Sequence, residues 1–165
     1  MTRQGEDNFR GGRMGGTVFN LEDKYKGQLV AGSFANRRFN YDLSICLAPG
    51  QMPTQAGDVL IEWPDFGVPD ANVEKEVRAA MKKVLTGLLR GDRMYVGCMG
   101  GIGRTGTFLA LLVKVLGSGF PVEYVRSEYL YFAVETAAQE AYIENFNVYS
   151  LRLFYWWQKL RYAIA

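Results

Sequence analysis

The sequence predicts an α/β domain with a central, largely parallel sheet of about four to five strands, flanked by helices and followed by a helical C-terminal half. Two observations predict this class. Strand-like and helix-like segments alternate over the first two thirds of the chain, and only helical patterns follow them. The chain has 165 residues, of which 48% are hydrophobic, which suits one core. We therefore expect a single domain over residues 17–165, preceded by a flexible, Gly-rich arm over residues 1–16.

Four segments have the composition of strands. Residues 28–32 and 41–47 are rich in aliphatic side chains, and the second segment alternates in polarity until the turn residues at 49–50 end it. Residues 58–62 form a third short segment, and residues 94–96 form a fourth one after an intervening helix. Because strands that are joined through a helix usually run parallel, we expect a mainly parallel sheet.

Helical spacing of apolar residues predicts a first helix from Asn72, as its N-cap, to about Leu89, and Gly91 closes it. Residues 108–116 are apolar on nearly all sides, which is typical of a buried central helix. Three further helices complete the pattern: Pro121–Tyr129, a helix with Thr136 as its N-cap, and Ser150–Tyr162.

The composition excludes several kinds of site and partner. The chain has no histidine and two cysteines, too few for Ser-His-Asp catalysis, a zinc site or a disulfide scaffold, and we expect no metal and no cofactor. The net charge of +2 comes from interspersed charges, which does not favour a nucleic-acid partner. Residues 108–116 are about half as long as the ~20 residues of a membrane span, and residues 1–16 lack a signal-peptide pattern. We therefore expect a cytoplasmic protein without membrane contact.

A short glycine-rich loop with a thiol at one end and a guanidinium at the other follows the fourth strand. Because the loop leads into a helix, its backbone amides should converge at a helix N-terminus, where anions bind. Cys98 is the candidate nucleophile, Arg104 would hold two oxygens of a phosphate group, and Thr105 would donate a hydrogen bond to the sulfur. The residues expected to bind phosphate are Met99, Gly100, Gly101, Ile102, Gly103 and Arg104.

A second segment, Trp63-Pro64-Asp65, supplies a carboxylate for proton transfer. Asp65 is the candidate general acid and base, and Phe66 is a candidate lid residue. The alternatives are structural: a turn aspartate at position 65 and a buried strand-end cysteine at position 98. The glycines at 101, 103 and 106 also fit a dinucleotide-binding fingerprint, but that interpretation gives Cys98 no role.

With residues 133–140 as a third segment, these motifs resemble the cysteine-dependent protein tyrosine phosphatases and their dual-specificity relatives: a Cys-x5-Arg-Thr-Gly phosphate loop, an acid loop and a glutamine loop. The resemblance implies a protein-tyrosine-phosphatase-like fold and the hydrolysis of phosphate monoesters on proteins through a cysteinyl-phosphate intermediate. It assigns Gln139 to the orientation of the hydrolytic water. Glu135 stands where tyrosine-specific members usually carry glutamine and matches dual-specificity members instead, and Gly97 replaces the usual histidine.

Two other functions stay open. One is a pseudophosphatase module that binds a phosphorylated partner without turnover, and the other is a phosphatase for a non-protein substrate such as a phosphoinositide or an RNA 5′ end. The loop interior has no basic residue to meet neighbouring phosphates, which favours a phosphoprotein substrate. Residues 36–39 loosely resemble the family's phosphotyrosine-recognition loop, but a surface turn is the favoured interpretation.

Two further features lie outside these motifs. Cys46 is interpreted as a buried strand residue; the alternative, implied by some relatives, is a thiol that captures oxidised Cys98 as a disulfide. The aromatic C-terminal helix is expected to cover the core with one set of residues and to offer a second set for self-association. The core set is Leu153, Trp157, Leu160 and Ile164, and the second set is Tyr155, Trp156 and Tyr162.

Overall fold

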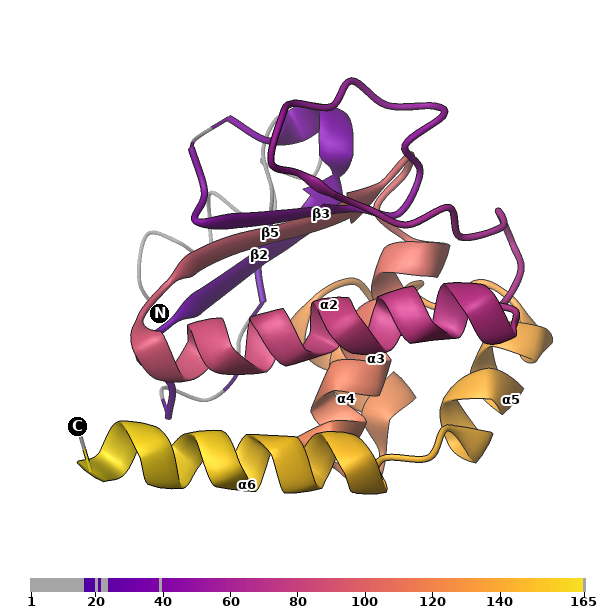
Figure 1. The fold of residues 1–165 in the computed structure, drawn as a ribbon. Helices are drawn as coiled ribbons and strands as arrows, with labels where there is room; N and C mark the ends of the chain where they lie inside the picture. The colour runs from indigo at the N-terminus through magenta and orange to yellow at the C-terminus, as the bar shows by residue number, and fades with distance from the viewer. Residues whose placement is uncertain (1–16, 20, 22–23, 39, 165) are drawn as a thin grey trace.

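The computed structural model describes residues 17–19, 21, 24–38 and 40–164 (Figure 1). The expected arm at 1–16 lies outside these residues. The sheet has five strands in the order β1-β2-β5-β3-β4, and all neighbouring pairs are parallel except β1 with β2. The strands are β1 (Thr17–Val18), β2 (Gln28–Ser33), β3 (Leu43–Cys46), β4 (Val59–Leu60) and β5 (Arg93–Cys98). The expected fold class is confirmed, although the sequence does not predict the two-residue strand β1.

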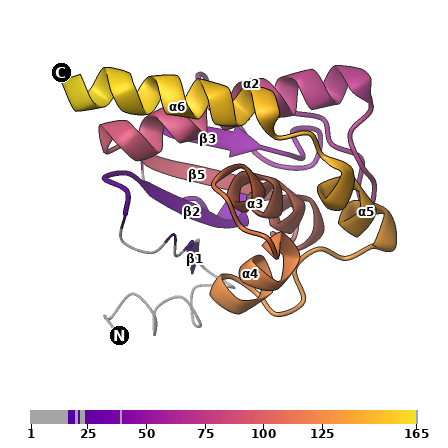
Figure 2. The same ribbon diagram turned by 90° about the horizontal axis from the view of Figure 1, so that it is seen from below.

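In the part of the chain that the structure describes, the α-helices lie on one face of the sheet (Figures 1 and 2). They are α2 (Ala71–Arg90), α3 (Gly103–Val115), α4 (Pro121–Glu128), α5 (Ala137–Asn145) and α6 (Tyr149–Ile164). The short 3-10 helix η1 (Phe34–Asn36) and the loop that leads to β4 lie on the other face (Figure 1). No described helix is both long enough and apolar enough to cross a lipid bilayer.

The helix ends confirm two expected caps and correct two others. Gly91 adopts the left-handed conformation that closes α2, and the Thr136 side chain caps α5. The cap of α2 is Asp70 rather than Asn72, because the Asp70 carboxylate accepts a hydrogen bond from the Val73 amide at 2.8 Å. At α6 the helix has already begun before Ser150.

The expected core face of α6 was wrong. The side chains of Leu153, Trp157 and Leu160 are exposed, as is that of Trp156. Instead Leu151 is buried, and Phe154 and Tyr155 pack against the core at the helical spacing of three and four residues. The helix carries two apolar stripes, and its contact with α2 selects this one. The side chain of Ile164 lies outside the described residues.

Alternation along the strands divides the apolar side chains between two faces. The face toward the helices includes Val96 and Cys98 of β5, and α3 is buried on nearly all sides, as expected. The opposite face holds a smaller cluster of Val30, Phe34, Cys46 and Tyr95. Cys98 therefore ends β5 on the helix side, and residues 99–102 join it to the start of α3.

Candidate active site

The Cys98 thiol is buried at the junction of β5 and α3. Its Sγ accepts hydrogen bonds from the Gly101 amide at 3.2 Å and from Thr105 Oγ1 at 3.0 Å. The bond from Thr105 is the one expected from the sequence. The two donors fix the position of the sulfur at the base of the loop that leads into α3.

The phosphate loop, residues 98–104, is fixed by close backbone contacts. Gly101 has a φ of 73°, and a Cβ there would lie 2.5 Å from the Gly32 carbonyl carbon. The Tyr129 hydroxyl donates to the Gly101 carbonyl at 2.5 Å. At Gly97 a Cβ would lie 2.7 Å from the Gly32 carbonyl oxygen, so no side chain fits there, histidine included.

Arg104 is buried and joins three loops. Its Nη1 donates to the Trp63 carbonyl at 3.2 Å, and its Nη2 donates to Gln51 Oε1 at 3.2 Å. The same Nη2 lies 3.4 Å from Asp65 Oδ1. Within the described part of the chain, Arg104 Nε is buried without a hydrogen-bond partner. A buried guanidinium with an unused donor is suited to an oxyanion.

Two of these partners differ in how visible they are from the sequence. Asp65 is an expected site residue, and the structure brings its carboxylate to Arg104. Gln51 is a site residue that the sequence analysis missed, because it lies 53 positions from Arg104 in a turn segment without a recognisable motif.

The acid loop, residues 63–67, forms a tight turn beside Arg104. The buried Trp63 indole donates to the Gly67 carbonyl at 2.9 Å, and the Gly67 amide donates to the Pro64 carbonyl at 3.0 Å. Phe66 is 58% exposed and has a φ of 56°. The turn places Asp65 on the side of Arg104 and leaves Phe66 at the surface, as a lid residue would be.

Gln139 is fully buried, and both heteroatoms of its amide bond to backbone groups. Oε1 accepts from the amides of Glu135 at 2.9 Å and Thr136 at 3.3 Å. Nε2 donates to the Gly67 carbonyl at 3.3 Å. Gln139 therefore links the N-terminus of α5 to the acid loop.

Comparisons with known proteins indicate the family of the chain. The model of the protein-tyrosine phosphatase family matches residues 58–116, which include the acid loop and the phosphate loop. Two proteins of Methanocaldococcus jannaschii, uncharacterized proteins MJECL20 and MJ0215, are each 30% identical over 128 and 125 residues; the matches cover 78% and 76% of this chain and 80% and 72% of theirs. The chain belongs to the protein tyrosine phosphatase-like superfamily. The resemblance seen in the sequence is thereby confirmed.

Solved structures share the fold of this superfamily member. The active form of Tk-PTP aligns with a TM-score of 0.54 and 18% identity, over 77% of this chain and 93% of Tk-PTP. A mutant form of Tk-PTP aligns with a TM-score of 0.57 and 17% identity, over 82% and 97%. At this identity the likeness concerns the fold alone.

Glu135 lies at the rim of the phosphate loop. Its carboxylate is so close to the start of α3 that a Cβ added to Gly103 would be 2.3 Å from Glu135 Oε1. Met99, at the other side of the loop, is 47% exposed. The Glu135 carboxylate therefore lies at the rim of the loop near Gly103.

The two cysteines of this phosphatase-like domain face opposite sides of the sheet. Cys46 pairs in register with Gly97, so its side chain points to the face opposite that of Cys98. Burial raises the pKa of the Cys46 thiol. The arrangement supports the interpretation of Cys46 as a buried strand residue. It argues against a disulfide, because Cys46 is in register with the residue before Cys98 and the two thiols therefore point to opposite faces of the sheet.

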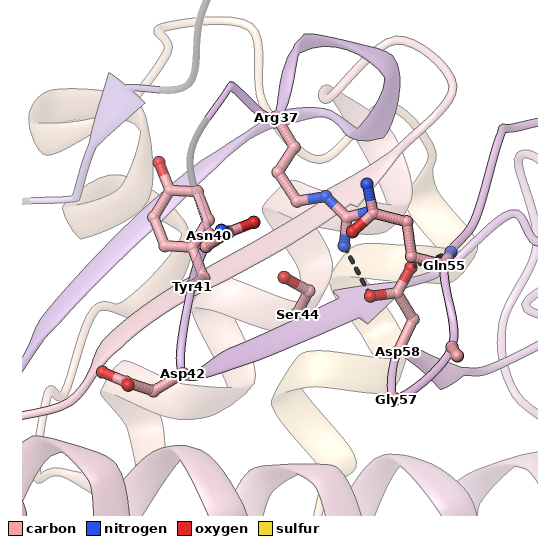
Figure 3. A pocket seen from close by; sticks show the side chains of 9 residues that line it. Arg37, Asn40, Tyr41, Asp42, Ser44, Gln55, Gly57 and Asp58 are labelled. Carbon is pink, nitrogen blue, oxygen red and sulfur yellow. Dashed lines mark hydrogen bonds and ion pairs between the residues drawn. The ribbon is translucent and has the colours of Figure 1, made fainter.

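A separate polar cavity of about 290 Å³ lies on the Tyr95 face of the sheet (Figure 3). Arg37 and Asp58 line it as an ion pair of 2.5 Å, and the Arg37 guanidinium lies 4.3 Å from the centre of the Phe34 ring. Both side chains are nearly buried. Arg37 is therefore held in the structure of this face, and Phe39 of the same segment lies outside the described residues.

Proposed function

We propose that this protein is a phosphatase that hydrolyses phosphate monoesters on proteins, phosphotyrosine first and phosphoserine or phosphothreonine as a wider range, through a cysteinyl-phosphate intermediate. One observation carries the proposal: a thiol with two hydrogen-bond donors, a buried guanidinium with an unused Nε and a carboxylate beside that guanidinium occupy one site. These are the three groups that phosphoryl transfer to sulfur needs.

In the first step, Cys98 Sγ attacks phosphorus, an S–P bond forms and the ester P–O bond breaks. Asp65 gives its proton to the leaving oxygen. The Arg104 guanidinium and the loop amides hold the three nonbridging oxygens. These oxygens share the negative charge of the phosphoryl group in the transition state.

In the second step, water attacks the phosphorus of the cysteinyl-phosphate and Asp65 takes the proton. The S–P bond breaks, inorganic phosphate leaves and the thiolate accepts the hydrogen bonds of Gly101 and Thr105 again. The cycle changes no oxidation state and uses no cofactor. It needs a reduced Cys98 thiol, so we place the protein in a reducing compartment such as the cytoplasm.

The charge around the loop favours substrates with one phosphate group. The loop interior has no lysine or arginine apart from Arg104, and the Glu135 carboxylate lies at its rim. A phosphoinositide or an RNA 5′ end would bring additional negative groups to this rim. A phosphorylated side chain brings a single one.

The test is hydrolysis of p-nitrophenyl phosphate and of phosphopeptides in the presence of a chelator, with Cys98→Ser as the control. We expect turnover by the wild type, no measurable turnover by Cys98→Ser, and radiolabelled phosphate bound to the denatured wild-type protein after a brief reaction. Serine is hardly ionised at neutral pH, so this variant should bind substrate without attacking it. Binding of phosphopeptide without any turnover dependent on Cys98 would establish the binding module instead.

A further inference from the structure

Two neighbouring carbonyls of the acid loop accept side-chain hydrogen bonds from the start of α5. Thr136 Oγ1 donates to the Phe66 carbonyl at 3.3 Å, and Gln139 Nε2 donates to the Gly67 carbonyl at 3.3 Å. The two segments are about seventy residues apart in the sequence, so local structure does not bring them together. Asp65 lies directly before the two carbonyls that α5 holds.

The Gln139 amide has little capacity for a water molecule. Its Oε1 already accepts two backbone hydrogen bonds, and the residue has no exposed surface. A group that orients the hydrolytic water must reach the open space above the phosphate loop. The geometry of Gln139 instead serves the backbone on both sides of it.

The acid loop and the segment before α5 each contain a residue with a strained backbone. Among the described residues, Phe66 at φ 56° and Val134 at φ 65° are the non-glycine residues with a positive φ. A positive φ is unfavourable for a residue with a Cβ and persists only where the surroundings enforce it. One of these residues lies in the acid loop, and the other lies two residues before Thr136.

The other end of the acid loop is held by the phosphate loop, since Arg104 Nη1 donates to the Trp63 carbonyl. Asp65 is thus suspended between two anchored ends. We propose that Gln139, assisted by Thr136, is a positioning residue that keeps the acid loop in the conformation in which Asp65 reaches the leaving oxygen. This inference rests on the proposed function and replaces the water-orienting role expected for Gln139.

The test variant is Gln139→Glu, which has nearly the same shape. Its carboxylate can still accept from the amides of Glu135 and Thr136, but it cannot donate to the Gly67 carbonyl and is repelled by it. We expect kcat/KM to fall by about tenfold to a hundredfold for phenyl and alkyl phosphates, as for a misplaced catalytic group, and much less for p-nitrophenyl phosphate, whose leaving group needs little protonation.

The double variant Asp65→Asn with Gln139→Glu isolates the mechanism. If Gln139 acts through Asp65, the second substitution adds little to the first, because the loop no longer presents an acid. Independent, multiplicative losses would overturn the proposal. So would a uniform loss of kcat/KM across leaving groups, since kcat/KM reports the step in which the leaving oxygen is protonated and a displaced acid affects that step more for poor leaving groups.

The matched control is Glu140→Gln, the reverse exchange at the next position of α5, where the exposed carboxylate pairs with Arg126. We expect this variant to keep the wild-type kcat/KM both for phenyl and alkyl phosphates and for p-nitrophenyl phosphate. If Gln139→Glu does not fold, Thr136→Val should show the same leaving-group dependence more weakly, and Thr136→Ser should restore the rate because it keeps the hydroxyl. A wild type without Cys98-dependent turnover refutes the proposed function, whereas active variants without these patterns refute only the positioning role.

Discussion

Asp65 shows how one side chain can be decisive for some substrates and dispensable for others. Its carboxylate is 39% exposed and lies 3.4 Å from Arg104, so it faces both solvent and the expected position of the phosphate group. We expect Asp65→Asn to slow hydrolysis of alkyl phosphates by roughly 10²–10⁴, the usual contribution of a general acid or base, and that of p-nitrophenyl phosphate by less. A plot of the logarithm of kcat/KM against the pKa of the leaving alcohol measures this difference. Equal losses for all leaving groups would remove Asp65 from the acid role.

The close packing of the surrounding backbone requires glycine at position 97. An added Cβ would lie 2.7 Å from the Gly32 carbonyl oxygen and 2.8 Å from the Phe34 amide nitrogen, and both atoms belong to backbone that cannot swing away. We expect Gly97→Ala to displace β2 from β5, lower the melting temperature and reduce turnover sharply. Gly57→Ala, where nothing lies near the added Cβ but φ is 91°, is a control for backbone strain alone.

Cys46 has no route to Cys98 without a change of strand register. We expect mild peroxide to inactivate the wild type and Cys46→Ser at the same rate, with the same recovery in dithiothreitol. Burial raises the pKa of the Cys46 thiol and so keeps it protonated and slow to react. Mass spectrometry of the oxidised protein should find no Cys46–Cys98 peptide. Loss of recovery in Cys46→Ser would show that the sheet opens to admit the disulfide.

At the scale of elements, the sequence predicted the features that depend on residues close together in the chain. The cap at Thr136 and the closure at Gly91 depend on residues within one helical turn, and the sequence predicted both. The cap at Asp70 was missed because two good capping residues lie two positions apart, at 70 and 72, and the entry of the chain decides between them. The stripe of α6 that faces the core was missed because it depends on contact with α2.

Lys114 ties α3 to the end of α5, and its role is structural. Its ammonium donates to the carbonyls of Ile143, Glu144 and Phe146 at 2.8, 2.6 and 3.0 Å. Burial lowers the pKa of this amine, but the three carbonyls at a helix C-terminus favour its charged form. Lys114→Met should destabilise the protein by about 1 kcal/mol, because two partly buried carbonyls and one exposed carbonyl lose their common donor.

Denaturant unfolding measures this loss, and Lys75→Met, an exposed lysine of α2, is the matched control. We expect the control to change the unfolding free energy by less than about 0.5 kcal/mol, as surface substitutions usually do. Equal effects of the two substitutions would mean that the α5 carbonyls find water instead. Turnover of Lys114→Met should persist at temperatures where the variant is folded.

At the scale of the whole molecule, the site is a consequence of parallel strands. The loops that follow β3, β4 and β5 leave the same edge of the sheet, and they supply Gln51, the acid loop and the phosphate loop. The sequence identified two of these loops by their motifs. It could not identify Gln51, because strand order and the path of the loop after β3 bring it to Arg104, and neither is written in local sequence.

This convergence predicts that an anion stabilises the entire fold. Arg104 joins three loops and keeps an unused, buried Nε, so phosphate bound there would engage the loops together and bind only the folded chain. At a concentration 100 times the dissociation constant, inorganic phosphate should add about 2.7 kcal/mol, which raises the melting temperature by roughly 5–10 °C for a domain of this size. Cys98→Ser should keep most of this shift because the loop and Arg104 remain. Arg104→Ala should lose it, and a shift of equal size in that variant would mean that phosphate acts on the protein elsewhere.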